Sequence, residues 1–303
     1  MPEAHPLSGV YAAAITPVDE EYKPDLDAIQ KLMAFYSDRG CHGALILGTT
    51  GEGPSFSSTE RLEIMQAAAE IKKIRPEFRL FAGTGTPGRA ETIGLNQAAF
   101  ELGYDAVVVL PPFYFRSASD AGLLEWFGDV IKESVPEDKL LLGYHIPQVS
   151  GVALSVNLLQ QLNSRFPTRL GGVKDSEGKL ETTQGFTEAF PDKLILVGSD
   201  RLLSSGLEAG ASGSITALAN LIAPWLRKIF DQHGKQDSSE LQAKVDTARN
   251  VLEQFAPFPP SIKFLIDAYT EFPAWPVLPP LLALDEQRQA SLKSQFDEIY
   301  KDE

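Results

Sequence analysis

A lysine that follows a short apolar run is the first residue of this chain that could do chemistry. Lys174 lies in the segment GGVKDSEG, residues 171–178, at the end of the run and just before a turn. Burying an ammonium group against apolar side chains is costly unless the group is paired or neutral. A neutral lysine amine is a nucleophile towards carbonyl groups. From the local sequence alone, the alternative is a lysine whose head simply reaches water.

Hydroxyl groups follow other apolar runs. Tyr144 lies in the second half of the run KLLLGYHIP, residues 139–147, and Thr49 and Thr50 lie in the turn GTTGEG, residues 48–53. A glycine-flanked turn with two hydroxyls and free backbone N–H groups can bind a carboxylate or phosphate without a positive charge. The turn is not a nucleotide P-loop, because it lacks the Gly-Lys-Ser/Thr ending.

Metal and dinucleotide sites are not favoured by the spacing. Among the four histidines only His145 lies at a predicted strand end, and no His, Asp and Glu set has ligand spacing, so we predict no metal site. GTGTPG, residues 83–88, formally fits a dinucleotide fingerprint, but the nearest acidic residue, Asp105, begins its strand instead of ending it. A carbonyl substrate would then be activated as an iminium with lysine.

The elements that must position these residues alternate regularly along the chain. Eight short apolar runs, each followed by an amphipathic segment, predict eight parallel strands buried on both faces. Eight such units in one domain's length favour a closed (β/α)8 TIM barrel, with an open doubly wound sheet as the alternative. The predicted strands are 10–17, 43–48, 80–85, 105–112, 139–147, 170–176, 193–200 and 212–217.

The alternation stops after His233. Helical patterns at 236–256, 261–271 and 285–301, joined by proline-rich connections, predict a C-terminal helical extension. We therefore divide the chain into a barrel, residues 1–233, and an extension, residues 234–303, that packs on it.

Composition narrows the class of protein. The 303 residues carry a net charge of −14, which argues against nucleic acid and anionic membranes as partners. Cys41 is the single cysteine, so no intrachain disulfide can form. Since the start of the chain does not read as a signal peptide and no apolar run is long enough to span a bilayer, we expect a cytoplasmic protein.

In a TIM barrel, functional residues lie at the C-terminal ends of the strands. Lys174 would leave the sixth strand there and Tyr144 the fifth, about 4.8 Å away in the hydrogen-bonding direction. A phenol and an amine could then meet over one substrate atom. Asp175 would point the other way and serve a structural role.

Taken in order, GTTGEG, PPFYF, Tyr144 in YHIP, VKDSEG and GASGSITALAN resemble the dihydrodipicolinate synthase / N-acetylneuraminate lyase superfamily, over residues 10 to 225. The resemblance implies a class I lyase that forms a Schiff base with pyruvate or a related 2-keto acid and needs no other cofactor. It also implies a homotetramer built as a dimer of dimers.

The resemblance assigns roles position by position. Lys174 matches the Schiff-base lysine and Tyr144 the general acid/base. Thr49 and Thr50 match the pair that holds the keto-acid carboxylate, and Thr49 also bonds the tyrosine. Tyr114 matches a tyrosine that completes a proton relay in the neighbouring subunit. Further substrate-binding positions implied in this way are Ile215, Gly198, Asp200, Arg201 and His145.

Two departures bear on the substrate. Dihydrodipicolinate synthases carry an arginine for the second substrate's carboxylate where this chain has Val149, whereas VSG, GTTGEGP and GSD are similar to the sugar-acid lyases. We therefore predict cleavage of a 2-keto-3-deoxy sugar acid, with Arg201 at its tail and His145 altering the pocket. The alternatives are a dihydrodipicolinate synthase, a 2-keto acid dehydratase and a non-catalytic keto-acid-binding protein.

Overall fold

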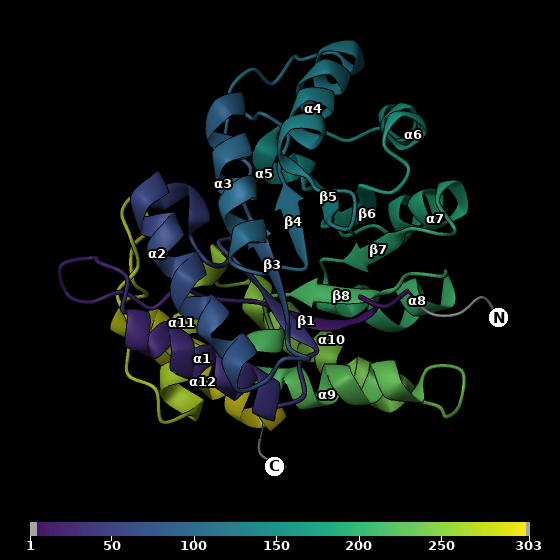
Figure 1. Cartoon of the computed structure of the whole chain (residues 1–303). Coiled ribbons are helices and arrows are strands. Elements are labelled where there is room, and N and C mark those ends of the chain that lie inside the picture. Colours follow the sequence, from purple (N-terminus) through teal and green to yellow (C-terminus); the bar gives the residue numbers. More distant parts are fainter. Residues whose placement is uncertain (1–4, 301–303) are drawn as a thin grey trace.

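Eight parallel strands close into a barrel in chain order, β1 to β8, in the computed structural model, which describes residues 5–300 (Figure 1). The predicted TIM barrel is confirmed, and the open sheet is wrong because β1 pairs with β8 as well as β2. The strands are β1 Gly9–Ala13, β2 Gly43–Ile46, β3 Arg79–Gly83, β4 Ala106–Val109, β5 Leu140–His145, β6 Leu170–Asp175, β7 Leu194–Val197 and β8 Gly213–Thr216.

Helices surround the barrel, and several begin at a residue that caps the first turn. Asp25 accepts from the N–H of Ala28, and Ser57 forms a capping box with Glu60. The helices are α1 Leu26–Asp38, α2 Ser58–Ala69, α3 Arg89–Glu101, α4 Asp120–Ser134, α5 Pro147–Ser150, α6 Val156–Arg165, α7 Leu180–Ala189, α8 Leu203–Glu208, α9 Ala219–Gln232, α10 Ser239–Glu253, α11 Phe258–Tyr269 and α12 Glu286–Tyr300. Short 3-10 turns occur at η1 Gly53–Ser55, η2 Glu70–Lys73 and η3 Asp200–Leu202.

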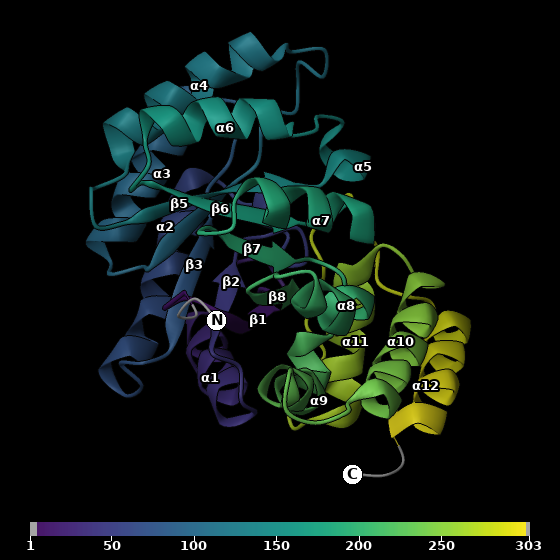
Figure 2. The same cartoon turned by 90° about the vertical axis from the view of Figure 1, so that its right-hand side faces the viewer.

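The last three long helices, α10 to α12, pack beside α9 on one side of the barrel (Figure 2). α10 also contacts η3, directly after β7. β7, which precedes η3, ends at the C-terminal face of the barrel. The extension therefore reaches the face where the active site of a TIM barrel is expected. The division of the chain at residue 233, into a barrel and an extension that packs on it, stays a prediction. Within residues 5–300 no helix is both long and apolar enough to cross a membrane.

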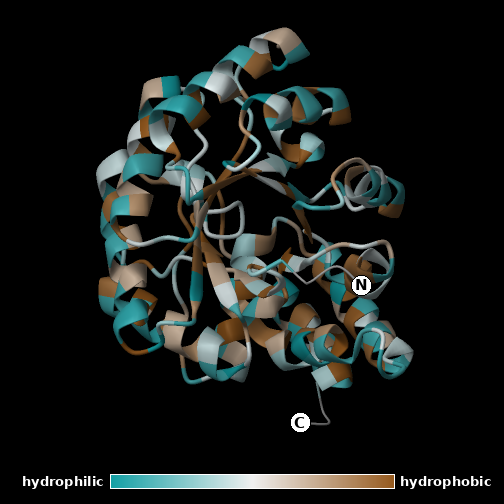
Figure 3. Ribbon diagram, turned by 45° about the vertical axis from the view of Figure 1, so that its right-hand side comes forward, coloured by the Kyte–Doolittle hydropathy of each residue, from teal (hydrophilic) through white to brown (hydrophobic). Residues whose placement is uncertain are grey.

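The strands bury both faces, as the apolar runs predicted, and the hydropathy colouring shows brown strands inside a more polar helical layer (Figure 3). Towards the N-terminal ends of the strands, the barrel interior is filled by Tyr11 and Phe81, whose ring centres lie 4.7 Å apart. The interior is therefore a packed core and not a channel. Any substrate must bind above it, at the C-terminal ends of the strands.

Asn220, at the start of α9, connects the first strand of the barrel to the last. Its amide donates to the carbonyl oxygens of Ala13 (2.8 Å) and Ala217 (2.7 Å) and accepts from the N–H of Ile15 (3.1 Å). The hydroxyl of Tyr36 also donates to it. All four bonds are buried, so they fix the loops that follow β1 and β8 beside the site.

Candidate active site

A β-bulge in β6 sets the register that brings lysine and tyrosine together. Leu141 pairs with Leu170, but Leu142 pairs with Gly172, so one extra residue enters β6. If the same sequence paired without a bulge, Tyr144 would lie opposite Val173, which faces the outer helices. With it, Tyr144 lies opposite Lys174 and both side chains point into the barrel.

Glycine is required inside that bulge. Gly172 has φ 144°, and a Cβ there would lie 2.0 Å from the carbonyl oxygen of Leu194 on β7. The glycine pair in GGVKDS thus leaves space for the bulge. The bulge in turn directs the Lys174 side chain into the barrel.

Lys174 and Tyr144 form the centre of the site. Lys174 is 3% exposed and Tyr144 4% exposed, and the lysine Nζ lies 4.0 Å from the centre of the tyrosine ring. The tyrosine hydroxyl lies 3.2 Å from the Thr49 Oγ1. An amine, a phenol and a hydroxyl therefore meet in one buried space.

The surroundings change the acidity of the phenol. Burial raises the pKa of Tyr144, but the positive charge of Lys174 and hydrogen bonds from Thr49, Lys174 and Ser176 outweigh it, so the pKa of Tyr144 lies below its usual value. A phenol with a lowered pKa exchanges a proton more readily near neutral pH.

The GTTGEG turn presents its hydroxyls beside this pair. Thr50 is buried, and among residues 5–300 no side chain or carbonyl pairs with its hydroxyl. Glu52, which has the left-handed backbone conformation (φ 55°), anchors the turn to the C-terminal extension. Its carboxylate lies 2.6 Å from the Nζ of Lys263 on α11 and accepts from the N–H of Leu278 (2.7 Å).

A cavity of about 310 Å³ opens above these groups, the small end of the range for ligand pockets. It contains the reactive groups from the strand ends and side chains of the extension. The lining residues are Ala13, Thr49, Thr50, Tyr144, Ile146, Gln148, Val149, Lys174, Ser176, Gly198, Ile215, Ala217, Arg249, Ala256, Pro257, Phe258 and Pro259.

Comparison with known proteins agrees with this geometry. Residues 6–299 match the model of the Dihydrodipicolinate synthetase family. This chain belongs to the dihydrodipicolinate synthetase family. The predicted family and the predicted enzyme class, a lyase, are thereby confirmed.

Relatives in this family carry several names. An uncharacterized DapA-like lyase of Chloroflexus aurantiacus is 34% identical over 293 residues, 96% of each chain. An N-acetylneuraminate lyase of Citrobacter koseri is 31% identical over 220 residues, 72% of this chain and 71% of that one. The crystal structure of dihydrodipicolinate synthase from Agrobacterium tumefaciens has a TM-score of 0.87 and 29% identity, covering 96% of this chain and 99% of that one.

Members of one family thus carry names that imply different substrates. The location of each predicted substrate-binding residue is therefore described separately. Thr49, Thr50, Gly198 and Ile215 line the cavity with Lys174 and Tyr144. A Cβ at Gly198 would lie 1.9 Å from the Ser176 Oγ, so glycine leaves space for that serine.

His145 does not reach the cavity, which corrects its predicted role. Because it follows Tyr144 on a strand, its side chain points outwards, towards the ring of Phe186 on α7. Its Nδ1 accepts from the N–H of Leu154 (3.1 Å), and its Nε2 lies 3.5 Å from the carboxylate of Glu177. Asp175 also points outwards, as predicted, and accepts from Thr183 (2.7 Å).

Asp200 and Arg201 likewise turn away from the cavity, because they lie in η3 and pair with α10. Arg201 forms an ion pair with Glu253 and a hydrogen bond to Asn250 (3.0 Å). Asp200 is fully buried and accepts from the Nη1 of Arg249 at 3.0 Å. Arg249, which the sequence did not single out, is the arginine that lines the cavity.

Tyr114 lies apart from the cavity. It is 76% exposed and Phe115 is 73% exposed, with ring centres 5.2 Å apart. Neither side chain is buried within its own chain, so the role of Tyr114 stays a proposal that depends on a second subunit.

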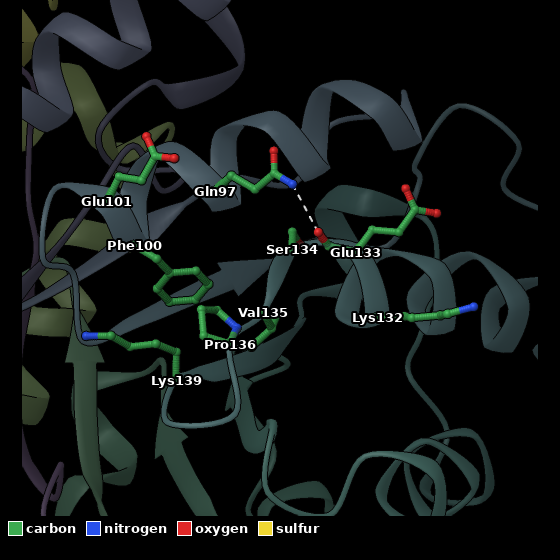
Figure 4. Close-up of a pocket in the computed structure, with 9 residues that line it drawn as sticks. All are labelled: Gln97, Phe100, Glu101, Lys132, Glu133, Ser134, Val135, Pro136 and Lys139. Carbon is green, nitrogen blue, oxygen red and sulfur yellow. Dashed lines mark hydrogen bonds between the residues drawn. The ribbon is translucent and has the colours of Figure 1, made fainter.

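A wider depression lies at the other end of the barrel. It has a volume of about 450 Å³ and is formed by the last turns of α3 and α4 and by the residues that lead into β5, including Lys139 (Figure 4). Its one hydrogen bond in that view joins Gln97 to the carbonyl of Glu133 (3.0 Å). Since it faces the N-terminal ends of the strands, it is not part of the active site.

Among the lining residues that sequence reasoning missed are Ser176, Arg249 and the segment 256–259. Ser176 was detectable, since it lies two residues after Lys174 and strand side chains alternate. The other two belong to the extension, where no local pattern indicates contact with the barrel. Within residues 5–300 no group of three or more His, Cys, Asp or Glu side chains could hold a metal ion.

Replacing Thr49 by valine is expected to move the pH–rate profile. The Thr49 hydrogen bond lowers the pKa of Tyr144, so its loss raises that pKa and shifts the corresponding limb of kcat/KM to higher pH. One hydrogen bond of about 1 kcal/mol also corresponds to a roughly fivefold lower rate. Thr50→Val is the control, expected to raise KM without moving the limb. Identical profiles for both variants would contradict the assignment.

Proposed function

We propose that this chain is a class I lyase that breaks or forms the C3–C4 bond of 4-hydroxy-2-keto acids through an imine on Lys174. The supporting observation is the buried Lys174 Nζ 4.0 Å from the Tyr144 ring, with the phenol bonded to Thr49. The 2-keto-3-deoxy sugar acids, predicted from the sequence, are members of this substrate class.

The proposed reaction follows from these groups. The Lys174 amine adds to the C2 carbonyl and water leaves, giving an iminium. Tyr144 takes the proton of the C4 hydroxyl while the C3–C4 electrons move towards the iminium, giving an enamine and releasing an aldehyde. C3 then takes a proton, and water hydrolyses the iminium to pyruvate and the free amine. The iminium itself accepts the electrons, so the step needs no cofactor.

The substrate carboxylate is assigned to Thr50 and Thr49. The net charge of −14 repels an anion at long range, so the carboxylate must be held by local hydrogen-bond donors. The free Thr50 hydroxyl beside Lys174 provides one. This placement directs C2 of a bound keto acid towards the lysine.

Borohydride trapping with pyruvate tests the proposal. We expect intact mass spectrometry to show one adduct per chain, equal to pyruvic acid less one oxygen, and peptide mapping to place it on Lys174. Lys263, the other deeply buried lysine, is an internal comparison, because its Nζ is paired with Glu52. An unmodified Lys174 would refute the mechanism.

We also propose a cytoplasmic homotetramer, a dimer of dimers in which Tyr114 of one subunit completes the proton relay of its neighbour. The support is the exposed aromatic pair Tyr114 and Phe115, since adjacent exposed rings favour a covered surface. Sedimentation velocity at assay concentration is the measurement. A fully active monomer would contradict this assembly.

A further inference from the structure

The part of the cavity that remains after the reacting atoms are placed is mostly apolar. Thr49 and Thr50 are assigned to the carboxylate, Lys174 to C2 and Tyr144 to the C4 hydroxyl. Beyond C4 the substrate meets a surface that we call the apolar wall. The apolar wall consists of Ile146, Val149, Ala217, Ala256, Pro257, Phe258 and Pro259.

Polar groups beside the apolar wall are few and already paired. Gln148 donates to the carbonyl oxygen of Ser176 at 2.6 Å, and the Ser176 side chain, which also lines the cavity, is hydrogen-bonded to Tyr144. Among the lining residues only Lys174 and Arg249 carry a charge. A polyhydroxylated tail would therefore lose its hydrogen bonds to water and find few replacements.

Arg249 brings no net charge to the cavity. Its Nη1 lies 3.0 Å from the Asp200 carboxylate and its Nε 2.9 Å from the Glu253 carboxylate, which also pairs with Arg201. Two guanidinium groups thus meet two carboxylates. The guanidinium of Arg249 also lies 4.6 Å from the ring centre of Phe258 in the apolar wall. This arginine is held against the apolar wall by its two carboxylate partners and is not a free anion receptor.

Two of the predicted substrate-binding residues face elsewhere. His145 points towards α7, and Arg201 pairs with α10. Val149, 56% exposed at the cavity mouth, adds no polar group in their place.

We infer that the preferred substrates are compact 4-hydroxy-2-keto acids whose carbons beyond C4 are uncharged and poor in hydroxyl groups, released as an apolar aldehyde. This inference rests on the proposed function. It narrows the substrate class away from the polyhydroxylated sugar acids that the sequence favoured. Each unpaired hydroxyl against such a wall is expected to lower kcat/KM roughly 10- to 100-fold.

A pair of six-carbon substrates tests the inference. Cleavage of 4-hydroxy-2-oxohexanoate is compared with that of 2-keto-3-deoxygluconate, which adds hydroxyls at C5 and C6, using both C4 epimers of each and following pyruvate with lactate dehydrogenase. We expect kcat/KM to favour the hydroxyl-poor compound roughly 100-fold or more. Equal or faster cleavage of the sugar acid would overturn the inference.

Borohydride trapping on the same preparation separates the two proposals. No adduct on Lys174 refutes the proposed function, whereas an adduct with preferred cleavage of the sugar acid refutes only the apolar specificity. An adduct with cleavage of neither compound also refutes the apolar specificity.

Two variants test the wall directly. Val149→Asn and Ala217→Ser each place a polar group in the apolar wall, so we expect the preference ratio to fall roughly tenfold. Leu282→Asn, at a residue that is 80% exposed and outside the cavity, is the control and should leave the ratio unchanged. An unchanged ratio in both wall variants would contradict the inference.

Discussion

Tyr144→Phe is expected to lower kcat by roughly 10²- to 10⁴-fold, the usual contribution of a positioned acid or base. The variant keeps the ring below Lys174 and removes only the hydroxyl that bonds Thr49. Because imine formation begins with the amine, borohydride trapping on Lys174 should persist at a lower rate. Pyruvate release and the trapped mass are the two measurements.

The matched control for that variant lies inside the same barrel. Tyr11 is fully buried at the opposite end of the interior, where its hydroxyl donates to the carbonyl of Leu7 (2.7 Å). Tyr11→Phe removes a buried hydroxyl without touching the cavity, so the rate should change less than about twofold while stability falls by about 1 kcal/mol. Equal losses of rate in both variants would show that Tyr144 acts only through packing.

Lys263→Met is expected to cost about 3–5 kcal/mol of unfolding free energy, because it leaves the buried carboxylate of Glu52 without its cation. Both side chains are almost fully buried, at 2% and 0% exposure. Since Glu52 anchors the GTTGEG turn, we also expect KM for the keto acid to rise. Denaturant unfolding and pyruvate-saturation curves are the measurements.

An exposed pair of the same length provides the comparison. Lys73 lies 2.6 Å from the Glu70 carboxylate, but at 73% and 39% exposure. Lys73→Met should therefore change stability by less than about 1 kcal/mol. If Lys263→Met were equally mild, Glu52 would not depend on Lys263, and the anchoring of the carboxylate turn would need another explanation.

The sequence was sufficient for the barrel and for the neighbouring strands of Lys174 and Tyr144. Apolar runs on both faces define parallel strands, and a closed barrel of eight places the fifth and sixth side by side. The register between β5 and β6 could not be predicted in the same way. The bulge at Gly171–Gly172 decides whether Lys174 or Val173 pairs with Tyr144, and a pair of glycines in a sequence is not sufficient to predict a bulge.

Three predicted substrate-binding residues, His145, Asp200 and Arg201, lie away from the cavity for two physical reasons. His145 was placed in the cavity although strand alternation, applied after Tyr144, sends it outwards. Arg201 follows the strand in a 3-10 turn, where that alternation no longer holds, and its direction is set by Glu253 and Asn250 of α10. The position of Arg249 depends on how α10 packs against η3, a contact between segments far apart in the chain.

The segment 256–259 belongs to the cavity although it lies beyond the last strand of the barrel. The groups assigned to proton transfer come from β5, β6 and the turn after β2, whereas much of the wall facing the leaving aldehyde comes from this later segment. On the proposed function, the groups that break the bond all lie in the barrel, whereas the wall that selects the aldehyde comes partly from the barrel residues Ile146, Val149 and Ala217 and partly from residues 256–259. On the same proposal, mutation confined to residues 256–259 is expected to change which aldehyde is preferred while the side chains of Lys174, Tyr144 and Thr49 stay as they are.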